Sequence, residues 1–172
     1  ASESCEITQE DIHGLNLVEL DSSFNSKIKD VSFMTNLRKL DAGGSYCGIT
    51  QEGIQGLNLV ELYSSDNSKI NDVSFMTNLM KLNASGDDCG ITQKGIQGLN
   101  LVELDVSYNS KINNVSFMTN LRKLIAAGSE CGIFQEGIHG LNLVELDAMD
   151  NPKINDVSPM VNLIKLTIGE TS

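Results

Sequence analysis

Residues 57–82 read LNLVELYSSDNSKINDVSFMTNLMKL, and residues 99–124 repeat this stretch 42 positions later as LNLVELDVSYNSKINNVSFMTNLRKL. The leucines and Asn109 keep their columns, whereas Tyr63-Ser64-Ser65-Asp66 becomes Asp105-Val106-Ser107-Tyr108. The repetition covers nearly the whole chain as four units of 42 residues without insertions, and 21 columns are identical in every copy. Tandem repetition at this period predicts a solenoid in which each unit stacks on its neighbour with the same geometry.

Each unit contains two halves with related patterns. The first half follows L-x-x-L-x-S-x-x-N-x-x-I from Leu17 to Ile28, and the second follows L-x-x-L-x-A from Leu37 to Ala42. Val-Glu-Leu-Asp at 18–21 alternates with period two, which is typical of a strand with one buried face. The stretch 51–56 is too short for a full helix and predicts a single helical or 3-10 turn. We therefore expect one domain over residues 1–172, with units 5–46, 47–88, 89–130 and 131–172 and about eight parallel strands.

An asparagine follows the first strand of every unit. Its side chain can bond the backbone in a turn, and stacked copies are predicted to form a buried ladder that satisfies neighbouring carbonyls. The members of this ladder are Asn25, Asn67, Asn109 and Asn151.

These patterns resemble the leucine-rich repeat family, whose signature is L-x-x-L-x-L-x-x-N/C-x-L. The first half of each unit is similar to the internalin-type variant, and the second half, with CGITQEGI at 47–54, is similar to the cysteine-containing variant. The third consensus leucine is Ser, Val, Ala or Ile here, and one extra residue lies between Asn25 and Ile28. Alternating halves of this kind are similar to arrays in some large DNA viruses and protists, and the near-identity of the copies equally suits an engineered consensus array. The resemblance implies an α/β, β-rich horseshoe with the strands on its concave face and short helical or 3-10 turns on its convex side.

The composition excludes several kinds of partner. The formal net charge is −11 and the isoelectric point about 4.4, so the surface repels phosphate backbones and no nucleic acid is expected. No apolar run approaches the ~18 residues needed to span a membrane, and the first residues carry no signal peptide pattern. Four cysteines recur ~10 Å apart, too far for a disulfide or a zinc site, and are predicted to be buried thiols. These features favour an intracellular, reducing compartment.

No catalytic or metal site is expected. The only histidines, His13 and His139, occupy the same column three units apart. A strict repeat supplies equivalent groups, whereas an enzyme needs converging and different ones. The acidic stretch 83–88 lacks the ligand spacing of a calcium loop. We therefore predict no enzymatic activity, no cofactor and no metal.

The third residue of each L-x-x-L pattern alternates in charge from strand to strand. Opposite charges on adjacent strands stabilise their pairing. This ladder is therefore interpreted first as a structural feature that fixes the strand register and keeps the sheet soluble. The alternative is a charged recognition strip, although invariant columns do not discriminate between targets. The ladder comprises Glu19, Lys39, Glu61, Lys81, Glu103, Lys123, Glu145 and Lys165.

The columns that differ between copies lie on and just after the strands. Aromatic and acidic side chains on a rigid sheet are typical of a protein-binding surface, so we predict a module that binds a protein or peptide, with a basic partner favoured. The alternative is neutral drift after duplication. Drift should also have changed the loops, yet Lys27 and Ser32, which lie in loops, are identical in all copies. The candidate binding residues are Asp21, Phe24, Tyr63, Asp66, Asp105, Tyr108, Ile125, Asp147 and Asp150.

The two ends differ in sequence. The stretch 5–14 can cover the first strand, and Glu6 and Asp11 stand where the other units have glycine, which suits a solvated outer edge. At the other end, the strand predicted over Leu163–Ile168 has no following turn to cover it, and an uncovered strand edge is a template for another chain. Homodimers or end-to-end assemblies through this edge are therefore expected as alternatives. The rival function is a self-assembling or engineered scaffold without a ligand.

Overall fold

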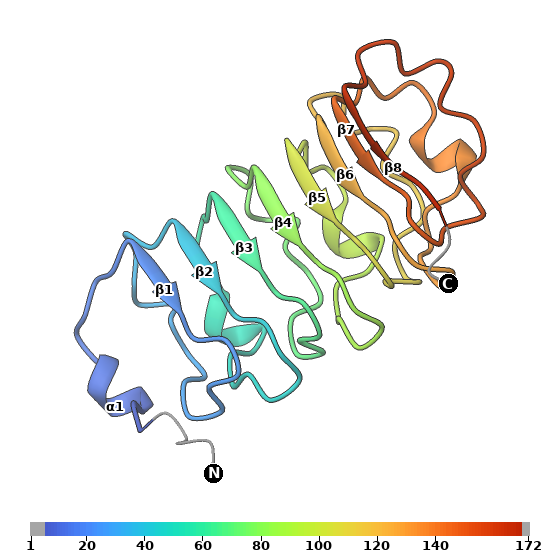
Figure 1. Cartoon of the computed structure of the whole chain (residues 1–172). Coiled ribbons are helices and arrows are strands. Elements are labelled where there is room, and N and C mark those ends of the chain that lie inside the picture. Colours follow the sequence, from blue (N-terminus) through green and yellow to red (C-terminus); the bar gives the residue numbers. More distant parts are fainter. Residues whose placement is uncertain (1–5, 170–172) are drawn as a thin grey trace.

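The computed structural model describes residues 6–169 as a solenoid of parallel β-strands with little helix (Figure 1). The elements are α1 (Gln9–Ile12), β1 (Glu19–Asp21), β2 (Lys39–Asp41), the 3-10 turn η1 (Glu52–Ile54), β3 (Glu61–Tyr63), β4 (Lys81–Asn83), η2 (Lys94–Ile96), β5 (Glu103–Asp105), β6 (Lys123–Ile125), η3 (Gln135–Ile138), β7 (Glu145–Asp147) and β8 (Lys165–Thr167). The short turn expected at 51–56 is confirmed by η1 and its copies. Within residues 6–169, no helix has the length and apolar character to cross a membrane.

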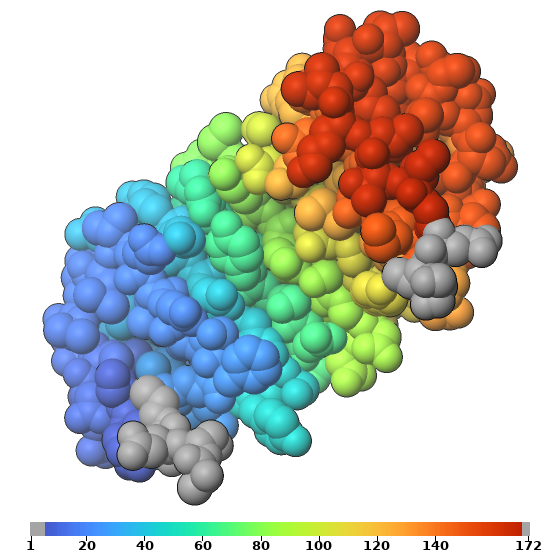
Figure 2. Space-filling model, in the orientation of Figure 1, coloured from blue at the N-terminus to red at the C-terminus, as the bar shows by residue number. Residues whose placement is uncertain are grey.

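The eight strands form one sheet in which each strand pairs in parallel with the next strand along the chain. The register aligns equivalent residues, for example Leu20 with Leu40 and Leu40 with Leu62. Each strand has only three residues, but backbone pairing continues beyond β1, where the Phe24 N–H donates to the Gly43 carbonyl at 2.9 Å. The body is therefore elongated, with its first and last units at opposite ends (Figure 2).

The core is built from columns of apolar residues spaced three apart. Ile28, Val31, Met34 and Leu37 are all buried. Tight turns create this spacing, because the Met34 N–H donates to the Val31 carbonyl and the Leu37 N–H to the Met34 carbonyl, both at 2.9 Å. Each such turn returns a side chain to the interior, where it packs on the same column of the next unit.

The predicted asparagine ladder is confirmed. The Asn109 side chain is 1% exposed, and its Nδ2 donates to the carbonyls of Ala84 at 2.8 Å and Ile91 at 3.2 Å. Its Oδ1 accepts the Lys111 N–H at 2.9 Å. Asn67 and Asn151 make the same three bonds, so each asparagine ties two neighbouring segments together.

The cysteine thiols are also buried as expected. Cys47, Cys89 and Cys131 are free and inaccessible, and burial raises the pKa of each thiol. Each thiol donates to the backbone carbonyl just after the first strand of the preceding unit, as Cys131 does to Val106 after β5 at 3.4 Å. The fourth cysteine, Cys5, lies outside the described residues. These thiols therefore act as small core side chains.

A candidate binding surface on the exposed sheet face

The exposed sheet face is formed by the first and third residues of the strands, whose side chains point away from the core. The first residues form the predicted charge ladder. Two members have an ion pair on each side: Lys81 Nζ lies 3.2 Å from Glu103 Oε1 and 3.9 Å from Glu61 Oε1, and Glu145 Oε2 lies 3.8 Å from Lys123 Nζ and 3.6 Å from Lys165 Nζ. Hydrogen bonding to Glu103 is the main cause of the raised pKa of Lys81. Such exposed pairs contribute little stability, which fits a role in aligning strands and keeping the face hydrated.

The third residues of the strands form a second row beside the charge ladder. Strand pairing places Tyr63, Asn83, Asp105 and Ile125 next to one another on four successive strands. These four side chains line a shallow depression of about 220 Å³, together with the neighbouring Lys81, Glu103 and Lys123. A smaller depression of about 90 Å³ follows on β6 to β8 and includes Asp147. The structure thus brings together three of the predicted binding residues, Tyr63, Asp105 and Ile125.

The depression combines a ring, an aliphatic group and polar groups. The Tyr63 hydroxyl donates to Glu61 Oε2 at 3.2 Å, and burial, reinforced by the charge of Glu61, raises the pKa of this tyrosine. Asn83 Nδ2 donates to Asp105 Oδ2 at 3.4 Å, while Ile125 supplies a half-buried apolar side chain. A ligand would therefore meet apolar surface at both ends of the row and hydrogen-bonding groups between them.

Several acids of this row also have a structural task that the sequence analysis missed. Asp105 Oδ1 accepts the Ser107 N–H at 2.9 Å and the Ser107 hydroxyl at 2.8 Å. Asp21 does the same with Ser23, and these hydrogen bonds lower the pKa of Asp21. Asp147 Oδ1 accepts the Met149 N–H at 3.0 Å. These contacts form Asx turns at the strand ends. For Asp21 and Asp105 the Asp-x-Ser spacing was the available sequence signal, whereas Asp147 is followed by Met149.

The remaining predicted residues lie outside the exposed sheet face. Phe24, Asp66, Tyr108 and Asp150 follow the strands in a loop row and have left-handed backbones, with φ between 54° and 60°. The ring of Phe24 lies over Gly44, where an added Cβ would come within 2.5 Å of the ring. Tyr108 covers Gly128 in the same way. The predicted set therefore divides into a sheet row, which includes Asp21, Tyr63, Asp105, Ile125 and Asp147, and this separate loop row.

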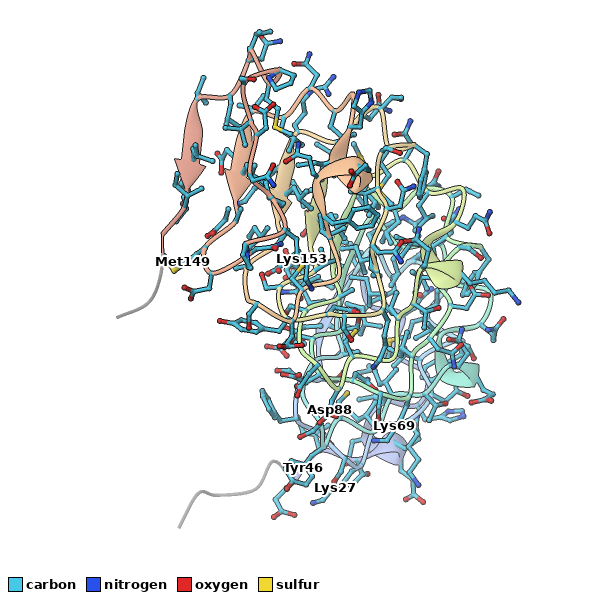
Figure 3. The ribbon with its side chains drawn as sticks, turned by 90° about the vertical axis from the view of Figure 1, so that its right-hand side faces the viewer. Lys27, Tyr46, Lys69, Asp88, Met149 and Lys153 are labelled. Carbon is cyan, nitrogen blue, oxygen red and sulfur yellow. The ribbon has the colours of Figure 1, made fainter. Side chains whose placement is uncertain are left out.

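A column of lysines gives a further correction. The Lys153 Nζ donates to the Cys131 carbonyl at 2.8 Å, Lys111 donates to the Cys89 carbonyl at 2.7 Å, and Lys69 donates to the Cys47 carbonyl. Figure 3 labels three lysines of this column, Lys27, Lys69 and Lys153, which belong to the first, second and fourth units. This contact between stacked segments explains why Lys69, Lys111 and Lys153 do not vary, whereas the Nζ of Lys27 lies 3.3 Å from Glu6 Oε2. Since the column has this structural task, its constancy is no argument against drift elsewhere.

No known protein-family model matches this chain, and no curated protein is similar to it in sequence.

Proposed function

We propose that this protein is a non-enzymatic leucine-rich repeat module that binds a protein or peptide on its exposed sheet face. In that family the sheet lines the concave side of a horseshoe. The pattern L-x-x-L with its following asparagine supports this assignment, as do parallel strands at each copy of the pattern and buried asparagines at the turn. The exposed sheet face then corresponds to the concave side, with the 3-10 turns behind it.

The observation that carries the proposal is the row of Tyr63, Asn83, Asp105 and Ile125 in the shallow depression. The flanking ladder residues are identical in every copy, whereas these four positions hold four different side chains. A rigid scaffold with a variable, partly apolar centre is suited to selective recognition, since aromatic residues in desolvated depressions contribute most to binding.

The geometry indicates the chemistry of the partner. Four adjacent strands cover ~15 Å, which an extended segment of about five residues can span. Asp105 favours a lysine or arginine at the middle of that segment, whereas Glu103 is already paired with Lys81 at 3.2 Å. Tyr63 and Ile125 favour apolar side chains on either side of it. The partner we propose is therefore an extended, basic and partly apolar peptide segment, presented alone or on a protein surface.

A peptide-display selection tests this function. The wild-type chain is used as bait, and bound peptides are counter-selected on a variant with Tyr63→Ser, Asp105→Asn and Ile125→Ser. We expect enriched peptides that bind the variant at least tenfold more weakly. A matched control carries Gln55→Ser, Gln97→Ser and Asn113→Ser, exposed positions outside the row, and should bind as well as wild type. Peptides that lose affinity equally on both variants, or an unenriched library, would contradict the proposal.

A second candidate is self-association through the final strand. Ile164 and Ile168 flank β8 and are 82% and 64% exposed, and Val161, three residues before Ile164, is 85% exposed. Edge-to-edge pairing of two β8 strands would cover part of this surface and give a closed dimer. Light-scattering mass over a hundredfold range of concentration distinguishes the candidates. A mass that doubles supports this second function, and a constant monomer mass removes it.

A further inference from the structure

The last described unit leaves two core positions partly uncovered. Ile154 and Val157 are half-buried, whereas their equivalents Ile112 and Val115 are completely buried. The Val157 N–H also has no hydrogen-bond partner between residues 6 and 169. These positions line an open hollow of about 740 Å³, which we call the terminal socket. Its walls include Ala148, Asn151, Ile154, Val157 and Ile168.

The earlier units show what fills a socket of this shape. In the third unit the segment Cys131–Ile138 lies across the equivalent positions. The Gly132 N–H donates to the Asn109 carbonyl at 2.9 Å, and the Gly137 carbonyl accepts the Val115 N–H at 2.8 Å. The same pair of bonds recurs in the two preceding units, at 2.9 to 3.0 Å, through segments 47–54 and 89–96. The socket therefore has a defined occupant in each earlier case.

That occupant needs glycine at two fixed positions. A Cβ on Gly132 would lie 2.4 Å from the Ile112 carbonyl oxygen, and a Cβ on Gly137 would lie 2.1 Å from the Asn113 carbonyl oxygen. Both obstacles are backbone atoms in a packed unit, so they cannot move aside as a flexible side chain would. A segment that enters the socket in this geometry must carry two glycines five residues apart.

The first unit of a second copy does not meet this requirement. Its equivalent segment has Glu6 in the column of Gly48 and Asp11 in the column of Gly53. Within the chain, a Cβ added to Gly48 or Gly53 would lie 2.4 or 2.0 Å from a carbonyl oxygen of the unit on which it stacks. The Cβ atoms of Glu6 and Asp11 would meet the same obstacle in the terminal socket. Asp11 also accepts the Thr8 N–H and hydroxyl at 2.8 Å, where α1 replaces the 3-10 turn. The N-terminal face is thus closed to stacking, which removes head-to-tail association in the internal register.

We propose that the terminal socket binds an extended peptide segment with the pattern small-Gly-Ile-x-x-x-Gly-Ile. Its first glycine N–H donates to the Asn151 carbonyl, and its second glycine carbonyl accepts the Val157 N–H. The isoleucines cover Ile154 and Val157, completing the core as Ile133 and Ile138 do one unit earlier. The socket is distinct from the row on the exposed sheet face.

Peptides taken from the chain itself provide the test. The probe is a fluorescent peptide of residues 47–56, CGITQEGIQG, and the first control is residues 5–14, CEITQEDIHG. A second control is the probe with Gly48→Ala and Gly53→Ala, which leaves its charge unchanged. Fluorescence anisotropy with the full 172-residue chain should show the probe binding at least tenfold more tightly than both controls. Equal affinity for the probe and its alanine form, or no binding of the probe, would overturn the inference.

Two surface variants locate the bound peptide. Ile168→Glu places a charge in the socket at a 64% exposed position, so it should reduce probe affinity at least tenfold without unfolding the protein. Val161→Glu, at an 85% exposed position outside the socket walls, is the matched control and should bind the probe normally. Equal effects of the two variants would mean that the probe binds elsewhere, and would refute the proposed site.

Discussion

Replacing Asn109 by alanine tests the main idea about how the units hold together. This side chain is 1% exposed and makes three hydrogen bonds, at 2.8 and 3.2 Å to the Ala84 and Ile91 carbonyls and at 2.9 Å from the Lys111 N–H. Each bond contributes ~1 kcal/mol net, and each buried group left without a partner costs ~1–3 kcal/mol. Because alanine removes all three bonds in a dry interior, we expect Asn109→Ala to lower the free energy of unfolding by about 3–5 kcal/mol.

Equilibrium unfolding in urea, followed by circular dichroism, measures this change. With a denaturant slope of about 2 kcal/mol/M, the midpoint should fall by about 1.5–2.5 M. In a solenoid each unit contacts only its neighbours. A lower slope in the variant would therefore show that the array has split at the third unit, with one side unfolding before the other.

Asn113→Ala is the matched control in the same unit. Asn113 is exposed, and its side chain has no hydrogen bond to any residue in the range 6–169. Its replacement should change stability by no more than ~0.5 kcal/mol. If Asn109→Ala lowered stability by less than ~1 kcal/mol with an unchanged slope, the ladder would not be a principal source of cohesion.

Three further predictions concern packing, thiols and the lysine column. Gly95→Ala places a Cβ 2.1 Å from the Asn71 carbonyl oxygen, whereas the Cβ of Gly98→Ala meets open space and the only cost is its left-handed backbone. Gly95→Ala should therefore lower the melting temperature several times more than Gly98→Ala. Because burial raises the pKa of Cys47, Cys89 and Cys131 above the unfolded value of ~8.5, their stabilising effect is complete below that pH and is lost as pH rises through the folded values. Urea midpoints between pH 7 and 10 should therefore fall more steeply in wild type than in the variant with all three replaced by alanine, and equal slopes would refute this account. Lys111→Met removes donors to the Cys89 and Asp87 carbonyls, at 2.7 and 3.1 Å, and should cost ~1 kcal/mol in urea unfolding, whereas Lys94→Met, at an exposed position, should be neutral.

The sequence predicted the arrangement of the chain because each repeated column has one physical task. Period-two alternation at 18–21 placed β1, and the fixed offset of 42 residues placed the first-half strands β3, β5 and β7 in the same register. Burial of the asparagines followed from their place after each strand. The finer shape implied by the family resemblance, a horseshoe with α/β character, stays a prediction, since the described structure contains parallel strands and little helix.

The division of the candidate residues could not be predicted from the columns alone. Phe24 and Tyr108 lie three residues after their strands, and alternation would have continued the strand through them. Instead the backbone takes a left-handed turn at each, with φ of 57° and 60°, and the side chain lies over a glycine from the next segment. An aromatic residue rarely adopts this conformation. The sequence signal for this turn was therefore the glycine column of the next segment, Gly44, Gly86 and Gly128, which leaves room for the side chain above it.

If the exposed sheet face binds a partner, the Asx turns also indicate which of its residues give selectivity for that partner. In the sheet row, aspartate and asparagine occupy the positions where a side-chain oxygen accepts a backbone N–H two residues later, as Asn83 does from Ser85 at 2.9 Å. An aspartate or asparagine there stabilises the turn, whether or not a ligand binds. Tyr63 and Ile125 occupy the same columns without such an acceptor oxygen, so the fold does not require one at these positions. They stand at the two ends of the central depression, so single replacements there, Tyr63→Ser and Ile125→Ser, separate binding from stability more cleanly than any replacement of the acids.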